Sequence, residues 1–283
     1  MNPERKFSTW EAAVQWLRSQ NDQASLVLAA YYDDPLVAAA ERYHCSEEWK
    51  AISEELHQKG GTALDIGAGR GIASYALAKD GFMVTALEPD PSDLVGSGAI
   101  RQLVAETSLS ITITEEYSEN LSFPDDSFDV VFARAVLHHA RNLDVACREI
   151  FRVLKPGGRF FAVREHVISR REDLPAFLNK HPLHKLYGGE NAFLLNEYLS
   201  ALSSAGFHVT KILSPLRSPI NFFPHTEESL RMELCLRLGR VSPLIQLLER
   251  FLKYPLLFRC LLGALGVFDH RPGRLYSFVA DKE

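Results

Sequence analysis

The sequence has no run of lysine and arginine residues, and its acidic residues outnumber its basic ones. The chain contains 36 aspartate and glutamate residues against 31 lysine and arginine residues, a formal net charge of -5. Proteins that bind a phosphate backbone do so with a dense basic surface that releases counterions. We therefore do not expect nucleic acid to be a partner of this chain.

Cysteine is also scarce, and its spacing excludes two classes of small scaffold. The four cysteines lie far apart along the chain, at Cys45, Cys147, Cys235 and Cys260. No pair has the CxxC spacing of a zinc site, and the set does not form a disulfide framework. The spacing favours buried free thiols in a reducing compartment.

Long apolar runs are missing as well. The segment from Met1 to Lys6 leads into mixed polar sequence without the apolar core of a secretory signal. The most apolar segment, residues 255–268, contains Arg259 and two glycines and is shorter than the ~20 residues of a membrane-spanning helix. The sequence thus predicts a cytoplasmic protein without stable membrane insertion, and its oligomeric state stays open.

What the sequence does have is the apolar content of a globular protein, with 46% hydrophobic and 24% charged residues. Its 283 residues exceed the usual domain of about 100 to 200 residues but fit one elaborated α/β unit. Residues 1–60 have apolar positions at helical spacing, so we expect a helical N-terminal cap. Its expected helices cover residues 8–19, 23–32, 35–43 and 46–59, with Ser8 and Ser46 as candidate caps.

From Thr62 onward, short apolar runs alternate with helical stretches, which is typical of βαβ units around a mostly parallel sheet. We expect seven strands, at residues 62–66, 83–87, 111–114, 129–133, 159–164, 208–213 and 275–280. Helices are expected at residues 72–79, 94–104, 143–154 and 196–205. The third of these should end at Lys155-Pro156-Gly157-Gly158, because proline cannot continue a helix and glycine permits a turn.

Two stretches, residues 165–195 and 214–273, are longer than the connections expected in such a unit, and we expect them to form a substrate lid. In the second stretch, residues 228–238 and 243–252 are leucine-rich and predict paired helices. Arginines among these apolar residues also admit a membrane-surface or lipid-substrate interpretation. Ordinary helix packing is favoured, because the chain lacks a dense basic face.

The first chemical signal is a glycine loop. Residues 64–71, LDIGAGRG, read as a buried strand that enters a glycine-rich turn, where backbone N–H groups can approach a ligand closely. Ile72 stands where the dinucleotide fingerprint GxGxxG has its third glycine, so a nicotinamide or flavin cofactor is less favoured. Glu88 follows the next expected strand, about twenty residues on, where a carboxylate can bind both ribose hydroxyls.

A third signal follows in residues 121–132, LSFPDDSFDVVF, together with Leu137-His138-His139 and the LKPGG turn at residues 154–158. With these segments in this order, residues 64–163 resemble the catalytic domain of class I S-adenosylmethionine-dependent methyltransferases, in their small-molecule group. The resemblance implies an α/β fold with a Rossmann-like seven-stranded sheet, its last strand antiparallel, formed by residues 61–213 and 274–283. It also implies S-adenosylmethionine as the cofactor.

The resemblance assigns residues to that cofactor by position. The predicted cofactor-binding residues are Asp65, Gly67, Ala68, Gly69, Glu88, Ser118, Glu119, Ala133 and Arg134. The glycine loop would surround the methionine part, Glu88 would bind the ribose, and Ala133 and Arg134 would lie next to the sulfonium. Ser118 and Glu119 would lie beside the adenine. The family often has an acidic residue where Tyr117 stands, so stacking or a backbone amide would serve the adenine here.

Histidines supply the candidates for acid–base chemistry. Methyl transfer from a sulfonium is an in-line displacement, and a hydroxyl acceptor also needs a base, for which histidine is suited near neutral pH. Our first candidate is His139, followed by His138 and His166, because all three follow strands at the edge that faces the site in open α/β sheets. For each of them, capping or packing is the competing interpretation.

The first insertion contains the predicted substrate-binding residues His181, His184, Tyr187 and Asn191. The HxxH spacing of the two histidines lacks a third ligand, so the sequence does not predict a metal site. Arg134 and Arg164 are candidates for an acidic substrate group, and Arg70 for the methionine carboxylate, with structural ion pairs as the alternative.

The predicted function is methyl transfer from S-adenosylmethionine to a small-molecule acceptor, at a hydroxyl group. N- or C-methylation, a non-catalytic S-adenosylmethionine-binding protein and a dehydrogenase are the alternatives. The fold itself does not choose the acceptor.

Overall fold

The computed structural model describes residues 6–56, 59–239 and 254–283. Four helices precede the sheet: α1 (Trp10–Arg18), α2 (Ala24–Ala29), α3 (Leu36–His44) and α4 (Glu47–Glu55), with the 3-10 helix η1 (Asn21–Gln23) after the first. Ser46 caps α4 as expected, since its side chain accepts a hydrogen bond from the Trp49 amide. At α1 the predicted cap Ser8 is wrong. Thr9 has the extended backbone of an N-cap, and its side chain accepts from the Ala12 amide.

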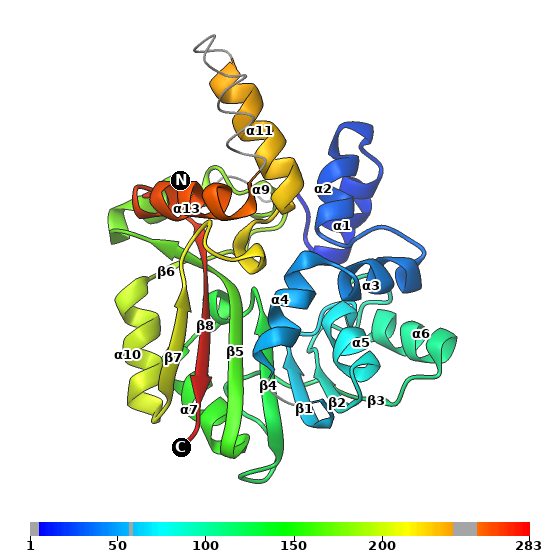
Figure 1. The fold of residues 1–283 in the computed structure, drawn as a ribbon. Helices are drawn as coiled ribbons and strands as arrows, with labels where there is room; N and C mark the ends of the chain where they lie inside the picture. The colour runs from blue at the N-terminus through cyan, green and yellow to red at the C-terminus, as the bar shows by residue number, and fades with distance from the viewer. Residues whose placement is uncertain (1–5, 57–58, 240–253) are drawn as a thin grey trace.

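All of the predicted strands are present in one sheet (Figure 1). They are β1 (Gly61–Ile66), β2 (Phe82–Leu87), β3 (Ile111–Thr114), β4 (Phe128–Arg134), β5 (Leu154–Ile168), β7 (His208–Leu213) and β8 (Arg274–Asp281). The sheet order is β3-β2-β1-β4-β5-β8-β7. The first five strands pair in parallel, and β8 runs antiparallel to both of its neighbours. The Rossmann-like sheet with an antiparallel last strand is therefore confirmed.

The strand β5 is much longer than the predicted range of residues 159–164. At its beginning, the Lys155-Pro156-Gly157-Gly158 segment belongs to the strand, and the Gly157 amide donates to the carbonyl of Lys282 at 2.7 Å. At its end, Glu165 to Val167 pair with Tyr276 to Arg274 of β8. A further two-residue strand, β6 (Phe193–Leu194), pairs with the last residues of β5 and was not predicted.

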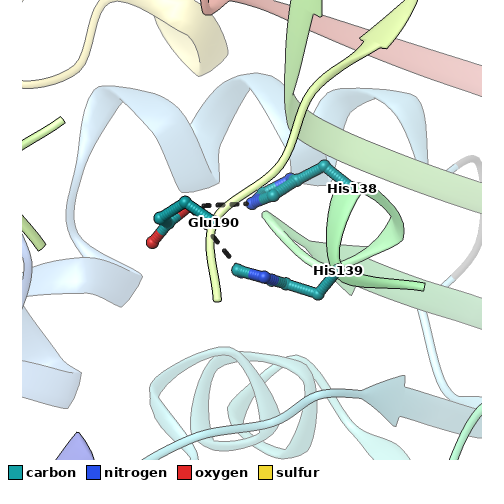
Figure 2. A group of neighbouring side chains, drawn as sticks. All are labelled: His138, His139 and Glu190. Atoms are coloured by element: carbon teal, nitrogen blue, oxygen red, sulfur yellow. Dashed lines mark ion pairs between the residues drawn. The ribbon is translucent and has the colours of Figure 1, made fainter. Parts of the chain in front are cut away.

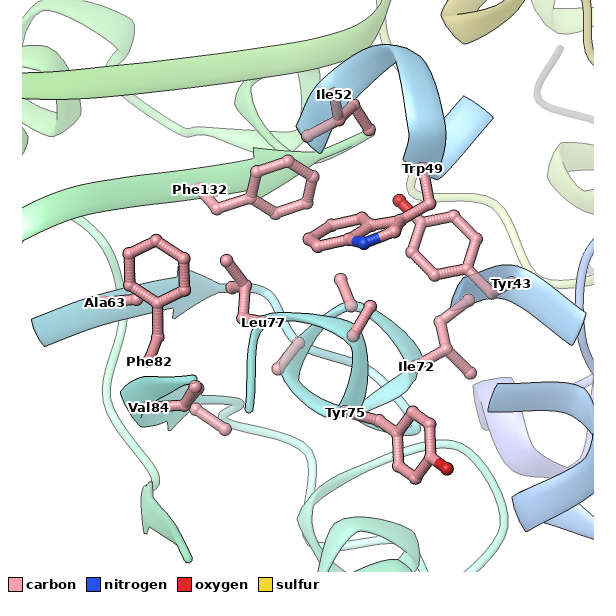
Figure 3. Close-up of a cluster of buried hydrophobic side chains, with 14 of the residues drawn as sticks. Tyr43, Trp49, Ile52, Ala63, Ile72, Tyr75, Leu77, Phe82, Val84 and Phe132 are labelled. Atoms are coloured by element: carbon pink, nitrogen blue, oxygen red, sulfur yellow. The ribbon is translucent and has the colours of Figure 1, made fainter. Parts of the chain in front are cut away.

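Helices cover both faces of the sheet. One core cluster joins α3, α4, α5 (Ile72–Lys79) and α6 (Ser97–Thr107) to one face. Figure 3 shows Trp49 of α4 lying between Phe132 of β4 and Tyr43 of α3 in this cluster. The second cluster joins α7 (Leu143–Val153) and α10 (Leu195–Ala205) to the other face. Alternate residues of β1 enter the two clusters, as the period of two in a strand requires.

The remaining elements lie near the end of the sheet where β1, β4 and β5 finish (Figure 1). They are η2 (Leu137–His139), η3 (Arg171–Asp173), α8 (Leu174–Leu178), α9 (Pro182–Leu186), η4 (Pro219–Asn221), α11 (Glu227–Gly239) and α13 (Pro255–Val267). The predicted helix at residues 228–238 is present as α11, and the predicted helix at residues 243–252 lies outside the described residues. In the part of the chain that the structure describes, no helix has the length and apolar character to cross a bilayer.

Candidate active site

A cavity of about 630 Å³ lies at the carboxyl ends of β1, β2, β4 and β5. Its wall combines the loops that follow these strands with Tyr31 before α3 and with residues 187–190 of the first insertion. Open α/β sheets bind ligands at this edge, because the loops after the strands converge there. Its volume lies in the range of small-molecule sites, about 300 to 1,000 Å³.

The glycine loop forms one wall of this cavity. Gly67 has a φ of +61°, and a Cβ atom on it would lie 2.6 Å from Cγ2 of Val136, so this position requires glycine. Asp65, the residue before Ile66 in β1, is 1% exposed and accepts a 2.6 Å hydrogen bond from the Ser74 hydroxyl. Burial raises the pKa of Asp65 to about 7. The Asp65–Ser74 bond fixes the loop between β1 and α5.

Glu88 lies where the sequence places it, directly after β2 in the cavity wall. Its Oε2 accepts a hydrogen bond from the Gly69 amide at 2.7 Å, and its Oε1 accepts from the Asp90 amide at 2.9 Å. Burial raises the pKa of this carboxyl group above its usual value. A carboxylate oxygen retains a second lone pair, so both oxygens can still accept from ribose hydroxyls.

The predicted adenine residues also lie in the cavity wall, beyond Glu88. The Ser118 hydroxyl donates to Oε2 of Glu119 at 3.1 Å, and the Arg141 amide donates to Oε1 of the same carboxylate at 2.9 Å. Tyr117 is 61% exposed beside them, and the Arg141 guanidinium lies 5.7 Å from the centre of its ring. The exposed ring of Tyr117 is thus available to stack on an adenine.

Of the two residues predicted beside the sulfonium, only Arg134 lines the cavity. Ala133 is fully buried in the core cluster on the α7 face, because neighbouring residues of a strand point to opposite faces. Arg134 donates from Nε and Nη2 to the two oxygens of Glu48, at 2.6 and 3.1 Å. This bidentate pair matches the structural ion-pair interpretation of Arg134.

The other two arginine candidates differ in how they are paired. Arg70 donates from Nη1 to the carbonyls of Tyr31 and Asp33, both at 2.9 Å, and from Nη2 to the Asp34 carboxylate. Arg164 reaches Glu48 at 3.3 Å, and its buried Nε has no hydrogen-bond partner among the described residues. Arg70 is therefore occupied in holding the N-terminal helices to the glycine loop.

The 3-10 helix η2 brings His138 and His139 to the cavity, as Figure 2 shows with Glu190 opposite them. His139 donates from Nδ1 to the carbonyl of Gly189 at 3.0 Å, so its neutral ring carries the lone pair on Nε2. Its side chain is 43% exposed. Burial, and next the neighbouring His138, lower the pKa of His139, which keeps the ring neutral near neutral pH.

His138 has a different environment, because it is 1% exposed and lies between two carboxylates. Its Nδ1 donates to Oε2 of Glu165 at 2.7 Å, and its Nε2 lies 3.5 Å from Oε2 of Glu190. Burial lowers the pKa of His138, but Glu165 and Glu190 outweigh burial and raise this pKa to about 9. This residue is held as a cation near neutral pH and is poorly suited to accept a proton.

His166 and His181 lie on the far side of Glu190. His166 donates from Nδ1 to the carbonyl of Gly273 at 2.9 Å, and burial lowers its pKa to about 3. His181 caps α9 and its Nδ1 lies 3.8 Å from Oε1 of Glu190. Both line the cavity, as does the predicted substrate residue Tyr187, whereas His184 and Asn191 do not.

Two acidic residues of this site were not predicted. Glu165 is fully buried and accepts hydrogen bonds from the amides of Val136, Leu137 and His138 as well as from the His138 ring. Glu190 follows two glycines in the first insertion. Glutamate is rarely buried, so its place beside a histidine in a strand with apolar residues on both sides could have identified Glu165.

Comparison with known proteins supports the class that this fold and site indicate. Residues 64–162 match the family described as "Methyltransferase domain". The chain is 32% identical over 124 residues to the uncharacterized methyltransferase YcgJ of Bacillus subtilis, covering 41% of this chain and 45% of that protein. It is 33% identical over 135 residues to 2-methyl-6-phytyl-1,4-hydroquinone methyltransferase of Synechocystis, covering 45% of this chain and 41% of that one.

Among solved structures, geranyl diphosphate methyltransferase in complex with S-adenosylmethionine shares the fold, with a TM-score of 0.56 and 16% identity over 90% of this chain and 94% of that chain. The chain spans less than half the length of the two curated relatives above. Residues 64–162 are a class I S-adenosylmethionine-dependent methyltransferase domain, and S-adenosylmethionine is the cofactor of this domain. The glycine loop, the Glu88 carboxylate and the adenine-side residues fit that cofactor.

Proposed function

We propose that this protein transfers a methyl group from S-adenosylmethionine to a hydroxyl group of a small molecule, and that His139 accepts the hydroxyl proton. S-adenosylmethionine supplies an electrophilic methyl group on a sulfonium. As the acceptor oxygen forms its bond to the methyl carbon, the carbon–sulfur bond breaks, its electron pair stays on sulfur, and the proton passes to Nε2 of His139. The acceptor becomes a methyl ether.

One observation carries this proposal. His139 is the histidine whose Nδ1–H is bound to a carbonyl, at Gly189, and whose ring is still 43% exposed at the cavity wall. A general base must present a lone pair within reach of the proton that it removes. His166 has the same tautomer, but it is more deeply buried, and His138 is tied to Glu165.

The remaining residues of the wall would position the two reactants. Glu88 would hold the ribose hydroxyls, and Arg134 would remain fixed by Glu48. Residues 181–190 would cover the acceptor and keep water out. Orientation alone can contribute roughly 7 to 11 kcal/mol to such a displacement. The Synechocystis relative is named for a hydroquinone and the structural neighbour for geranyl diphosphate, and both names support a small-molecule acceptor.

The test compares the wild-type protein with His139→Gln, using a panel of small hydroxyl compounds and a metabolite extract, with S-adenosylhomocysteine as the readout. We expect turnover to fall by about 10² to 10⁴, the usual contribution of a general base. S-adenosylmethionine affinity, measured by calorimetry, should stay within about twofold of the wild-type value, since His139 lies outside the predicted ribose and adenine contacts. His208→Gln is the matched control, because His208 lies on β7 with a side chain that is 63% exposed.

Full activity in His139→Gln would contradict the role of His139. If the methylated product carries the new group on nitrogen or carbon, the hydroxyl assignment is wrong and the methylation stands. Tight S-adenosylmethionine binding without turnover on any acceptor would favour the non-catalytic binding protein.

A further inference from the structure

Glu190 is surrounded by four imidazole rings that come from three separate parts of the chain. His138 and His139 belong to η2, His166 to β5, and His181 to the start of α9. Ring centres lie 4.1 Å apart for His138 and His139, 4.7 Å for His138 and His166, and 5.3 Å for His166 and His181. A general base needs one of these rings, so the other three require a different explanation.

The Glu190 carboxylate lacks a close partner within the described part of the chain. Its side chain is 9% exposed, and its nearest partners are the rings of His138, His181 and His139, at 3.5, 3.8 and 4.0 Å. A charge-assisted hydrogen bond has a length of about 2.8 Å, so these contacts are too long. Glu165, by contrast, accepts three amide hydrogen bonds of 3.0 to 3.1 Å and a 2.7 Å bond from His138.

The hydrogen bonds of the rings leave lone pairs available. His166 gives its Nδ1–H to the carbonyl of Gly273, so its neutral ring carries a lone pair on Nε2. The lone pair on Nδ1 of His181 accepts only a long hydrogen bond, 3.4 Å, from the His184 amide, and a metal ion would displace this bond. A histidine that donates one ring N–H to a backbone carbonyl and turns its other nitrogen inward is the usual arrangement of a metal ligand.

Glu190 belongs to two possible sets of three metal ligands. One set adds His138 and His139, and the other adds His166 and His181. In each set, the donor atoms all lie within 4.8 Å of one another. The second set is the better candidate, because His138 is already bound to Glu165 and His139 is the base in the reaction proposed above. Even if His138 carries a proton, the two carboxylates exceed the cations of this cluster by one charge. This excess negative charge favours binding of a cation.

We propose that His166, His181 and Glu190 bind one divalent transition-metal ion, such as Zn²⁺, with at least one open coordination position towards the cavity. Two imidazoles and one carboxylate are a ligand set that such ions accept. Ligand atoms of one ion lie within roughly 4 Å of one another, so the segment with His181 and Glu190 would close by about an ångström on binding. If the proposed hydroxyl methylation holds, the open position would bind the acceptor oxygen and lower the pKa of its proton.

The experiment uses the untagged full chain, first treated with a chelator, and Co²⁺ as the probe. We expect one equivalent of Co²⁺ to bind and to give a visible ligand-field absorption band. Affinity should fall more than about tenfold in Glu190→Gln and in His181→Ala, because loss of a ligand costs at least as much as loss of its supporting hydrogen bond. His184→Ala is the matched control and should keep wild-type affinity, since His184 does not line the cavity.

Absence of stoichiometric Co²⁺ binding, or unchanged affinity in Glu190→Gln, would overturn the proposal. If His139→Gln loses Co²⁺ binding and His181→Ala keeps it, the proposed ligand set is wrong. The ion would then be bound by His138, His139 and Glu190. If a variant does not fold, anomalous scattering from wild-type crystals soaked in Co²⁺ replaces it. A peak between His166, His181 and Glu190 would support the site, and no peak there would refute it. Co²⁺ binding is measured without an acceptor. A negative result would therefore contradict the metal site and would not contradict the proposed methylation.

Discussion

At the residue scale, the cofactor side of the site depends on Glu88. Its two oxygens accept from the amides of Gly69 and Asp90, which orients the carboxylate and links the end of β2 to the glycine loop. The same oxygens are the acceptors that two ribose hydroxyls would use. We therefore expect one side chain both to hold the glycine loop in place and to bind the ribose of the cofactor.

We predict that Glu88→Ala weakens S-adenosylmethionine binding by about 1.5 to 3 kcal/mol, roughly tenfold to a hundredfold, because hydrogen bonds to a charged group are lost. Isothermal titration calorimetry measures this change. Glu106→Ala, which removes an exposed carboxylate from α6, is the control and should bind as the wild type does. Equal affinities in the two variants would remove Glu88 from the cofactor site.

The residue scale also shows which parts of the site local sequence can reveal. Asp65, Gly67 and Glu88 belong to a motif that spans one strand, one loop and the next strand, so spacing alone brings them together. Glu190 acquires its histidine neighbours only through the path of residues 169–190 back across the strand ends. No short-range pattern encodes that path, and Glu190 was therefore missed.

At the element scale, Arg70 joins the N-terminal helices to the glycine loop. It donates to the carbonyls of Tyr31 and Asp33 and to the Asp34 carboxylate, so three of its contacts hold the connection between α2 and α3. Arg18 of α1 also contacts Asp34, with Nη1 2.7 Å from Oδ2. Of these two arginines, only Arg70 belongs to the glycine loop after β1, so only its contacts connect that loop to the N-terminal helices.

We predict that Arg70→Ala loosens residues 30–35 and lowers S-adenosylmethionine affinity by roughly tenfold, since hydrogen bonds of a buried charged group are worth about 1.5 to 3 kcal/mol. Hydrogen–deuterium exchange over α2 and α3 should become faster, and calorimetry gives the affinity. Arg18→Ala removes a contact to the same aspartate without touching the loop and should leave the affinity unchanged. If both variants lose S-adenosylmethionine affinity to a similar extent, the affinity depends on the contacts of Asp34 and not on the link between Arg70 and the glycine loop.

Elements with a local pattern were predicted well, and elements that depend on distant partners were not. The strand Ile111–Thr114 has its predicted bounds, because its isoleucine and threonine residues alternate with a period of two. The strand β5 exceeds its predicted range at both ends. Its extra residues pair with β8 and with Lys282, which follow more than a hundred positions later, and no window of local sequence contains that partner.

At the scale of the whole molecule, the cavity couples ligand binding to stability. Its wall draws on the N-terminal helices, four strand ends and residues of the first insertion, so a ligand there contacts all of these parts at once. A ligand that binds only the folded chain shifts the unfolding equilibrium by mass action.

We predict that S-adenosylmethionine at a hundred times its Kd raises the free energy of unfolding by about 2.7 kcal/mol. For a chain of this size, that corresponds to a rise in Tm of roughly 5 °C, which differential scanning calorimetry can measure. NAD should cause no shift, because Ile72 replaces the third glycine of the dinucleotide fingerprint. A comparable rise in Tm with NAD would instead support the dehydrogenase alternative.

The position of β8 between β5 and β7 has a consequence for the order in which the molecule assembles. The strands β1 and β2 lie close together in the chain, with Gly61 paired to Phe82, and β4 joins them further on, with Ala63 paired to Val130. The end of β5 that carries His166 is aligned by β8, with His166 paired to Leu275 more than a hundred residues later. Contacts that close long loops form slowly, because loop-closure entropy opposes them. The nascent domain can thus acquire its nucleotide-binding half first, and the acceptor half follows when β8 docks.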